Sequence, residues 1–227
     1  MKTMDTAVAL VQAYLHVNGY FTVAEYPVLE AMNRDNYRTL TDIDLLAYRL
    51  PHAGGLVPAK QRGAKQPVAA HLTDPILGVS EGGPDLLIAE VKEGRAVLNQ
   101  GARSPGVLKS VLVRFGCCRL ADLDDIVAPL MHRGHVRTKS GSTIRLVAFG
   151  SAVTDQSGGY LAVPLDHVVG FLQTHLQSHW SYLRQAQIKD AAFGFLVALE
   201  KARRAGMHGA VDQVQLRAHS SDREVRA

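Results

Sequence analysis

Apolar side chains near the start of the chain recur every three to four positions, which is the spacing of a helix with one buried face. Val8, Val11 and Leu15 follow this spacing, and Asn18-Gly19 is a typical helix stop, so we predict a helix over residues 5–18. Further along, short stretches that are dense in apolar and β-branched residues predict strands. These stretches are residues 20–31, 37–50, 85–92, 143–151 and 160–165.

Only the polar turn NRDN, residues 33–36, separates the first two predicted strands, which makes a β-hairpin the simplest connection between them. Pro27 favours an edge position for the first strand, because proline has no N–H to donate to a neighbouring strand. Predicted strands and helices are interspersed along the chain, which is typical of an α/β protein with a mixed sheet. The later helical patterns lie at residues 105–115, 121–133, 166–183 (with Asp166 as N-cap) and 187–204.

Residues 51–84 interrupt this order, because they are rich in proline and glycine and show little periodicity. We interpret them as a long loop or insertion. The expected organisation is therefore an α/β core over residues 1–151, a strand and helical extension over 152–205, and a flexible polar tail over 206–227.

Composition narrows the class of protein. Of the 227 residues, 47% are hydrophobic and 20% are charged, which provides enough apolar material for a packed core and excludes the disordered and fibrous classes. No apolar run of 18 or more residues is present and the N-terminus has no small-residue cleavage site, so we expect a cytoplasmic protein without a membrane span or secretory signal. The net charge of +4 is compatible with a polyanionic partner.

The predicted strand DLLIAEVKEG, residues 85–94, carries charges at the end of an apolar run. Glu90 and Lys92 are two positions apart, so in a strand they point to the same face. A carboxylate there can bind a hard cation such as Mg²⁺, and an ammonium can stabilise charge on a phosphate or help to deprotonate a water. The alternative is a structural ion pair, which contributes roughly 0–1 kcal/mol to stability when exposed.

A single carboxylate rarely holds Mg²⁺, so a second one should come from a neighbouring strand. Asp44 supplies it, because pairing TDIDLLAYR with the 85–92 strand places Asp44 opposite Glu90. Asp85 does not, although Pro84-Asp85 spells the letters PD. It precedes Glu90 by five residues (90 − 85) on one strand, about 16 Å away, and points to the opposite face.

An Asp at the head of one strand and Glu-x-Lys at the end of the next resembles the motif of the PD-(D/E)xK nuclease superfamily, whose members share the restriction-endonuclease-like fold. DIDLLAYR and LLIAEVKEG are similar to the two halves of the motif in its resolvase-like and Mrr-like branches, and the resemblance covers roughly residues 5–150. It implies a three-layer α/β/α-type sandwich around a central mixed sheet, to which the chain adds a C-terminal helical extension.

The resemblance also implies a chemistry. Asp44 and Glu90 would bind Mg²⁺ or Mn²⁺, with the main-chain carbonyl of Val91 as a further ligand. Lys92 would position or activate the water that hydrolyses a DNA phosphodiester bond. The process served would be repair, recombination or defence.

Supporting residues are also implied by the resemblance. Many members of the superfamily add an acidic residue from the first helix; that helix offers only Asp5 here, at its start, and Glu25 on the first strand could substitute. In some branches a Gln in the helix after the motif supports the site. Gln100 matches that spacing, although a solvated helix position explains it equally well.

DNA is the expected partner, and loosely clustered basic residues could contact its backbone. They are Lys60, Arg62 and Lys65 in the insertion, and Arg133, Arg137 and Lys139 near the KSGS turn. A solvated charged face accounts for these residues equally well.

Two other functions stay open from the residues alone. A catalytically inactive nuclease-fold module would bind nucleic acid or protein, and the C-terminal helices would then form a homodimer or partner surface. The apolar residues of that surface are Trp180, Phe193, Phe195 and Leu199. His175 and His179 have the i, i+4 spacing of zinc ligands, but HLQSH lacks the Glu of a zinc-hydrolase helix, which favours a polar stripe.

Overall fold

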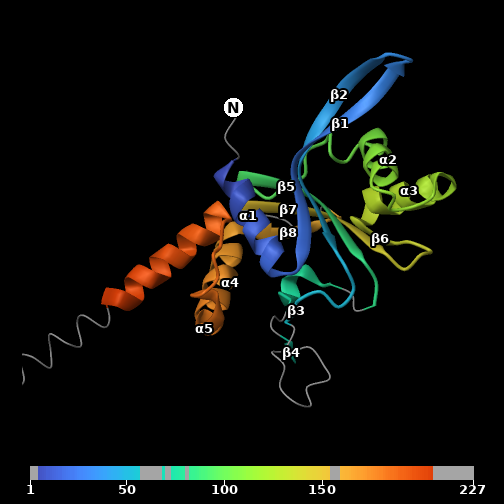
Figure 1. The fold of residues 1–227 in the computed structure, drawn as a ribbon. Coiled ribbons are helices and arrows are strands. Elements are labelled where there is room, and N and C mark those ends of the chain that lie inside the picture. The colour runs from blue at the N-terminus through green and yellow to red at the C-terminus, as the bar shows by residue number, and fades with distance from the viewer. Residues whose placement is uncertain (1–4, 57–67, 70–72, 80–81, 154–158, 207–227) are drawn as a thin grey trace, which may run out of the picture. The chain divides into compact units, whose positions relative to one another are not determined.

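The structure is a computed structural model that describes residues 5–56, 68–69, 73–79, 82–153 and 159–206 (Figure 1). The chain divides into two compact units, Met1–Phe171 and Leu172–Ala227. They are called the first and the second unit.

The first unit contains the sheet and the helices that flank it. Its elements are α1 (Thr6–Val17), β1 (Tyr20–Asn33), β2 (Asn36–Arg49), β3 (Gly55–Leu56), β4 (Val68–Ala69), η1 (Pro75–Leu77), β5 (Asp85–Arg95), α2 (Pro105–Arg114), η2 (Leu120–Asp122), α3 (Leu123–Arg133), β6 (His135–Arg137), β7 (Thr143–Ala152) and β8 (Leu161–Pro164). α4 (Leu165–Ser178) begins in the first unit and ends in the second, which also contains α5 (Trp180–Leu183) and a helix over residues 191–206. None of the helices in the described part of the chain is long and apolar enough to cross a membrane.

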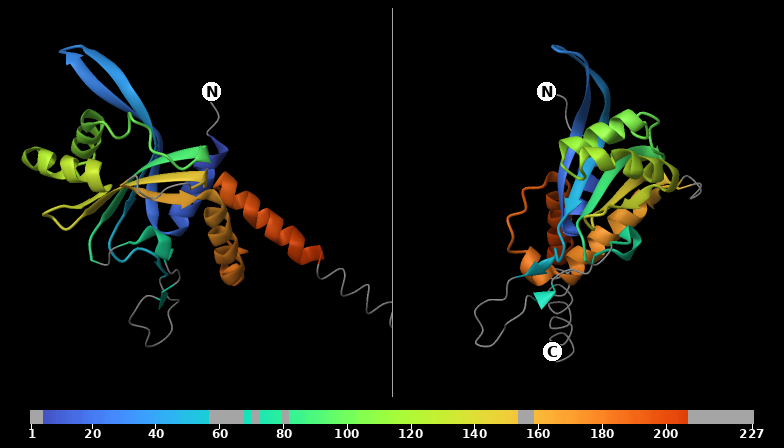
Figure 2. Two further views of the ribbon diagram at one scale, coloured as in Figure 1. Left: turned by 180° about the vertical axis from the view of Figure 1, so that it is seen from behind. Right: turned by 90° about the vertical axis from the view of Figure 1, so that its right-hand side faces the viewer.

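Six strands form one mixed, strongly curled sheet, a half-barrel with flanking helices, which confirms the predicted α/β class. The strand order is β1-β2-β5-β7-β6, and β8 also pairs with β7. β2 is antiparallel to both β1 and β5, whereas β7 is parallel to β5 and β8 and antiparallel to β6. Figures 1 and 2 show the curl of the sheet and the β1–β2 hairpin, which projects past the other strands.

The two faces of the sheet carry different helices. α2 and α3 pack on one face, where Leu108 and Leu112 of α2 belong to the same buried cluster as Ile144 of β7. Tyr14 of α1 is fully buried and meets Phe149 of β7 edge to face, with 6.2 Å between the ring centroids. Because alternate residues of a strand point to opposite faces, α1 lies on the face opposite α2 and α3.

Most predicted elements are confirmed. The five predicted strands correspond to β1, β2, β5, β7 and β8, and Pro27 lies on an edge strand, β1. The predicted N-cap at Asp166 is wrong, because α4 follows β8 directly and begins at Leu165. Asp166 therefore lies in the first turn, where its carboxylate accepts a hydrogen bond from the His167 N–H.

The segment 51–84 contains regular structure as well as loop. β3 pairs with β4, and η1 begins at Pro75 after the N-cap Asp74. β8 pairs with β7 and so belongs to the main sheet, past the predicted core boundary at residue 151. The parts of these segments that lie outside the described residues are 57–67, 70–72 and 80–81, and 207–227 of the predicted tail.

Candidate functional site

Asp44 lies where β2 and β5 separate. The two strands pair from Arg49 opposite Asp85 to Leu45 opposite Ala89, and the next opposed positions in this register are Asp44 and Glu90. Beyond Leu45 the ladder stops, and Oδ2 of Asp44 accepts a hydrogen bond from the Val91 N–H at 2.8 Å. The structure therefore brings Asp44 to the charged end of β5.

Glu90 is buried beside Asp44, with 2% of its surface exposed. Its Oε1 forms an ion pair with Lys92 Nζ, while its Oε2 is buried and has no hydrogen-bond partner among the described residues. Burial raises the pKa of Glu90, the hydrogen bond from Lys92 opposes this shift, and the nearby charge of Asp44 adds to it. A buried carboxylate oxygen without a partner is rare in folded proteins and needs an explanation.

Lys92 connects the two carboxylates to solvent. Its Nζ lies 3.9 Å from Oδ2 of Asp44 and its side chain is 41% exposed. Partial burial lowers the pKa of Lys92, but the hydrogen bond and charge of Glu90, together with the charges of Asp44 and Asp5, outweigh this effect and raise it. The group is therefore an ammonium that faces outward from a pair of acids.

Asp5, the acid at the start of the first helix, is close enough for its charge to act on Lys92. It is the N-cap of α1, where its Oδ1 accepts a hydrogen bond from the Ala7 N–H at 2.8 Å. Its charge contributes to the raised pKa of Lys92. The sequence offered Asp5 as the only acid of that helix, but it gave no signal for its proximity to Lys92.

Glu25, the predicted substitute, is placed less favourably. Its neighbours Ala24 and Tyr26 pair with Leu45 and Ile43, so Glu25 stands across from Asp44 on the edge strand. It is exposed and has φ +51°, a left-handed conformation that is strained for a residue with a side chain. Within the described residues, no three His, Cys, Asp or Glu side chains lie close enough together to hold a metal ion.

Gln100 is exposed and lies in a turn between β5 and α2, so the predicted helical position is wrong. The helix begins only at Pro105, after the N-cap Ser104, whose side chain accepts a hydrogen bond from the Val107 N–H. The intervening residues form a loop and a turn. Gln100 therefore has no helix to hold it toward Glu90.

Gly150 of β7 lies beside Lys92 in the β5–β7 pairing. The chain that leaves β5 crosses over this glycine, because a Cβ at position 150 would lie 2.7 Å from the Cα of Ala96. That distance is too short for any side chain, and the neighbour is backbone, which has little freedom to move. Gly150 thus fixes how the segment after Lys92 leaves the site.

The substitution Gly150→Ala is expected to lower the free energy of unfolding by about 1–3 kcal/mol, because the new methyl group overpacks against the backbone of Ala96. Gly94→Ala is the matched control, because a Cβ at Gly94 would meet no atom within 4 Å. Urea unfolding followed by circular dichroism measures both. Equal stabilities for the two variants would show that the crossing over Gly150 is not tight.

The predicted nucleic-acid-binding residues lie elsewhere or outside the described residues. Lys60, Arg62 and Lys65 lie in the segment that the structure does not describe. Arg137 pairs with Thr143 at the start of β7, whereas Lys92 pairs with Gly150. These positions of β7 are seven residues apart (150 − 143), or about 23 Å along the strand.

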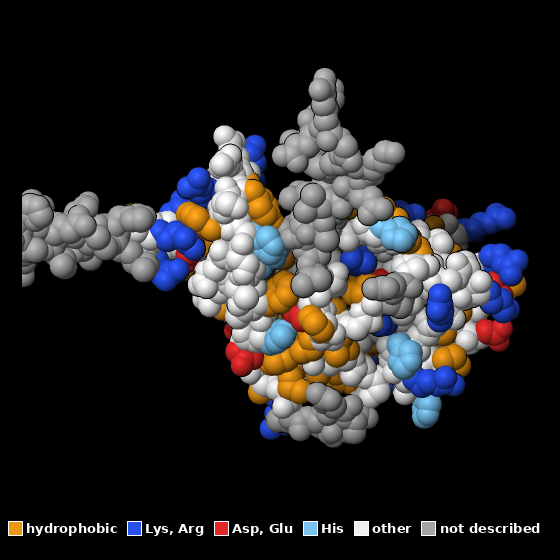
Figure 3. Space-filling model, turned by 90° about the horizontal axis from the view of Figure 1, so that it is seen from below, with side chains coloured by type: hydrophobic (Ala, Val, Ile, Leu, Met, Phe, Trp, Pro, Cys, Tyr) orange, Lys and Arg blue, Asp and Glu red, His pale blue; other side chains and the backbone are white. Residues whose placement is uncertain are grey.

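Lys139 and Arg133 have no contact with the two carboxylates among the interactions of the described residues. Lys139 follows β6 and forms ion pairs with Asp122 at 2.9 Å and Asp125 at 3.9 Å. Arg133 is the exposed last residue of α3. Figure 3 shows Lys and Arg side chains interspersed with acidic ones at this end of the molecule, which is typical of a solvated charged face.

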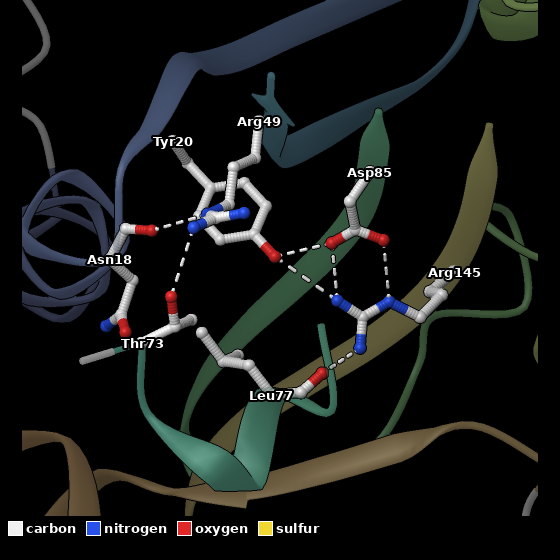
Figure 4. Close-up of polar contacts among 7 residues, drawn as sticks. All are labelled: Asn18, Tyr20, Arg49, Thr73, Leu77, Asp85 and Arg145. Carbon is white, nitrogen blue, oxygen red and sulfur yellow. Dashed lines mark hydrogen bonds and ion pairs between the residues drawn. The ribbon is translucent and has the colours of Figure 1, made fainter. Parts of the chain in front are cut away.

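A second buried polar cluster occupies the opposite end of β5 (Figure 4). Asp85 is buried, with 1% of its surface exposed. Its Oδ1 accepts a hydrogen bond from Arg145 Nε at 3.0 Å. Its Oδ2 accepts hydrogen bonds from Arg145 Nη2 and from the Tyr20 hydroxyl. Arg145 also donates to the carbonyl of Leu77. Both oxygens of Asp85 are thus satisfied, which agrees with its exclusion from the predicted metal site. Arg145 was not predicted from the sequence. It is the one charged residue in the otherwise apolar strand TIRLVAFG, and this isolated charge could have indicated a buried ion pair.

Two neighbouring networks connect this end of the sheet to the segment before β5. Arg49 donates to the carbonyls of Asn18 and Ala53 and to the Thr73 hydroxyl, at 2.9–3.1 Å. Asp74 Oδ2 accepts from the Tyr14 hydroxyl at 2.8 Å and lies 2.6 Å from His167 Nε2. These contacts hold the polar ends of β2 and η1 in place.

The second unit contains the residues of the predicted dimer surface. Trp180 stacks under the guanidinium of Arg204, with 4.9 Å from the guanidinium carbon to the ring centroid. Phe195 and Leu199 are exposed one helical turn apart, and Phe193 is buried. His175 and His179 lie one turn apart on this unit, with His179 Nδ1 2.9 Å from the His175 carbonyl oxygen. Dimerisation through these helices stays a prediction.

Comparison with known proteins gives no family for the chain. No family model matches it, and neither a curated protein nor a solved structure does. What the chain does must therefore be inferred from its own residues, among which Asp44, Glu90 and Lys92 form the most informative cluster.

Proposed function

We propose that the chain is a Mg²⁺-dependent nuclease that hydrolyses DNA phosphodiester bonds on a restriction-endonuclease-like, three-layer α/β/α core. The observation that carries the proposal is the cluster of Asp44, Glu90 and Lys92 at the point where β2 and β5 separate. Helices on both faces of a mixed sheet support the proposed core.

The residues present fit a hard divalent cation. Glu90 offers a buried oxygen that has no other partner among the described residues, and Asp44 offers carboxylate oxygens beside it. Mg²⁺ is commonly held by one or two carboxylates, with substrate phosphate and water completing its shell, and Mn²⁺ accepts the same oxygens. Asp44 and Glu90 would hold the cation, with the Val91 carbonyl as the further ligand. When bound, it would offset the negative charge that develops on the phosphate and the leaving oxygen.

Lys92 has a separate task in this proposal. Its ammonium is held by Glu90 at one side and reaches solvent at the other, so it can donate hydrogen bonds to a phosphate oxygen or to the attacking water. A donor fixed in advance toward developing charge stabilises the transition state without rearrangement. Asp44, bound to the Val91 N–H, keeps the two strands in the register that this geometry needs.

The decisive experiment is cleavage of labelled single-stranded, duplex and branched DNA with Mg²⁺ or Mn²⁺. Asp44→Asn is expected to abolish cleavage and to weaken Mn²⁺ binding measured by calorimetry, because it removes the charge of one proposed ligand. Asp42→Asn is the matched control, an exposed acid two positions away on β2. Cleavage by Asp44→Asn at the wild-type rate, or cleavage of every substrate in excess EDTA, would overturn the proposal.

A catalytically inactive nuclease-fold module is the second candidate. It is favoured by one observation: within the described residues no third acidic side chain joins Asp44 and Glu90 closely enough to complete a metal-binding group. Such a module would bind DNA or a protein without cutting DNA. Fluorescence anisotropy with the same labelled DNA distinguishes the nuclease from a DNA-binding module, because the module would bind DNA without cleavage at any Mg²⁺ or Mn²⁺ concentration.

A further inference from the structure

The outer part of the β1–β2 hairpin, residues 25–44, is a two-stranded arm that projects from the sheet (Figures 1 and 2). β2 pairs with β5 only through Leu45–Arg49, so the arm has no third strand. At its base the arm packs on α2, because Val28 and Ile43 belong to the same buried cluster as Leu108. Beyond this contact the arm carries exposed apolar and aromatic side chains.

A groove of about 640 Å³ lies between the arm and α2. Val28 and Leu123 are buried in it, whereas Leu29, Tyr37 and Leu120 are 53%, 60% and 74% exposed. Single apolar residues scattered over a protein surface are normal, but apolar and aromatic side chains that line one groove together indicate a contact surface.

The charged side chains that line the groove are both basic, and no acidic side chain of the described residues lines it. Lys109 pairs with Asp124, but the Asp124 side chain is 85% exposed and exposed ion pairs hold their partners weakly. Arg114 is exposed and has no ion-pair partner among the described residues. The groove therefore offers positive charge to whatever occupies it.

The groove begins beside the candidate site. Tyr26, which lines the groove, pairs with Ile43, the residue before Asp44. Glu90 points to the face of the sheet on which α2 packs, because Ile88, two residues earlier on β5, belongs to the buried cluster on that face. An extended molecule in the groove would therefore lead toward Asp44 and Glu90.

We propose that the groove binds an unpaired segment of DNA and leads it to Asp44 and Glu90, so that the substrate is single-stranded DNA or DNA with a single-stranded branch. This inference rests on the proposed nuclease function. Proteins bind single strands by combining positive charge, which meets the phosphates, with aromatic rings on which the bases stack. Arg114 and Lys109 supply the charge, and the exposed Tyr37 supplies the ring. At about 640 Å³ the groove has the volume of a small-molecule pocket, which accommodates unpaired bases but not a duplex.

The test is binding of labelled DNA to the full chain in excess EDTA, measured by fluorescence anisotropy, so that binding is measured without cleavage. A single strand of about 16 nucleotides is expected to bind more tightly than the duplex of the same sequence. Tyr37→Ala is expected to weaken single-strand binding about fivefold or more, the usual loss when one base-stacking ring is removed. Phe21→Ala is the matched control, because Phe21 is 69% exposed on the same hairpin but does not line the groove.

A second variant tests the charge of the groove. Arg114→Gln is expected to lower the slope of log Kd against log salt concentration by about 0.7, the contribution of one phosphate contact to a single strand. Arg184→Gln changes an exposed Arg of the second unit and is expected to leave this slope unchanged. Circular dichroism spectra identical to wild type establish that the variants are folded.

Four results would overturn the inference. They are the absence of DNA binding, tighter binding of the duplex, an equal loss in Phe21→Ala, and wild-type binding by both Tyr37→Ala and Arg114→Gln, which would leave the groove to a protein segment. The nuclease proposal is judged separately, by cleavage in Mg²⁺ or Mn²⁺. A wild type that binds single strands through Tyr37 without cutting them would overturn the nuclease and retain the groove as the DNA-binding site of an inactive module.

Discussion

Asp85→Asn is expected to lower the free energy of unfolding by about 3–5 kcal/mol, the usual loss when one partner of a buried ion pair is removed. Arg145 would keep its charge in a site where its side chain is only 11% exposed, with no carboxylate to balance it. Asparagine also offers one acceptor oxygen in place of two, so the Tyr20 hydroxyl and the two guanidinium nitrogens of Arg145 can no longer all keep their acceptors. Removing the buried charge of Asp85 also removes its desolvation cost, which favours the folded state. We expect this gain in stability to be smaller than the loss, because both oxygens of Asp85 already accept hydrogen bonds.

Urea unfolding followed by circular dichroism measures this loss, and Asp42→Asn is expected to stay within about 0.5 kcal/mol of wild type because Asp42 is exposed. A double-mutant cycle with Arg145→Gln adds a sharper test. The two substitutions break the same ion pair, so their combined effect is expected to fall short of the sum of the single effects by about 2 kcal/mol. Additive effects would mean that Asp85 and Arg145 do not depend on each other.

The sequence suggested Asp44 as the partner of Glu90 because a second carboxylate was needed at the charged end of the 85–92 strand. The apolar pattern does not fix this register, because Leu45, Leu46 and Ala47 of β2 are buried in succession and both faces of the strand are covered. Position along a single strand can be predicted from the sequence, which is why Asp85 could be excluded from the site at Glu90.

Other features depend on contacts between distant parts of the chain. Nothing local marks Tyr20 as a partner of Asp85, or Asp5 as a neighbour of Lys92. β6 has three residues, which is too short to show alternation. Without β6, the sequence could not indicate that Arg137 lies at the far end of β7 from Lys92.

The left-handed backbone conformation of Glu25 could not be predicted from the sequence either. Glutamate has no intrinsic preference for positive φ, so the residue type at position 25 does not predict this conformation. Glu25 was predicted as a supporting acid because it lies on the first predicted strand, and this prediction included no argument about the direction of its side chain. Strain of this kind is often found next to functional sites, and here it lies across from Asp44.

Glu90→Gln is expected to abolish cleavage and to leave the free energy of unfolding unchanged or raised by up to about 2 kcal/mol. Glu90 and Asp85 are both buried carboxylates on β5, but only Glu90 has an oxygen without a partner. Burial raises the pKa of Glu90, so its ionised form is disfavoured in the folded state. The neutral amide of Gln removes the cost of burying a charge, so the variant is expected to gain stability at pH values above the raised pKa of Glu90 in the folded state. This gain in stability is expected to disappear as the pH falls below 4.5, the pKa of the glutamate in the unfolded chain, because the carboxyl group is then protonated in both states.

Lys92→Ala completes the comparison, because it removes the donor and retains both proposed carboxylate ligands, Asp44 and Glu90. It is expected to reduce the cleavage rate about 10²–10³-fold, which is typical when one fixed donor to developing charge is lost. Mn²⁺ binding, measured by calorimetry, is expected to persist. The two ends of β5 therefore predict opposite outcomes: loss of stability with cleavage retained for Asp85→Asn, and loss of cleavage with stability retained for Glu90→Gln. A large loss of stability in Glu90→Gln, with cleavage intact, would make Glu90 and Lys92 a structural ion pair like the one at Asp85.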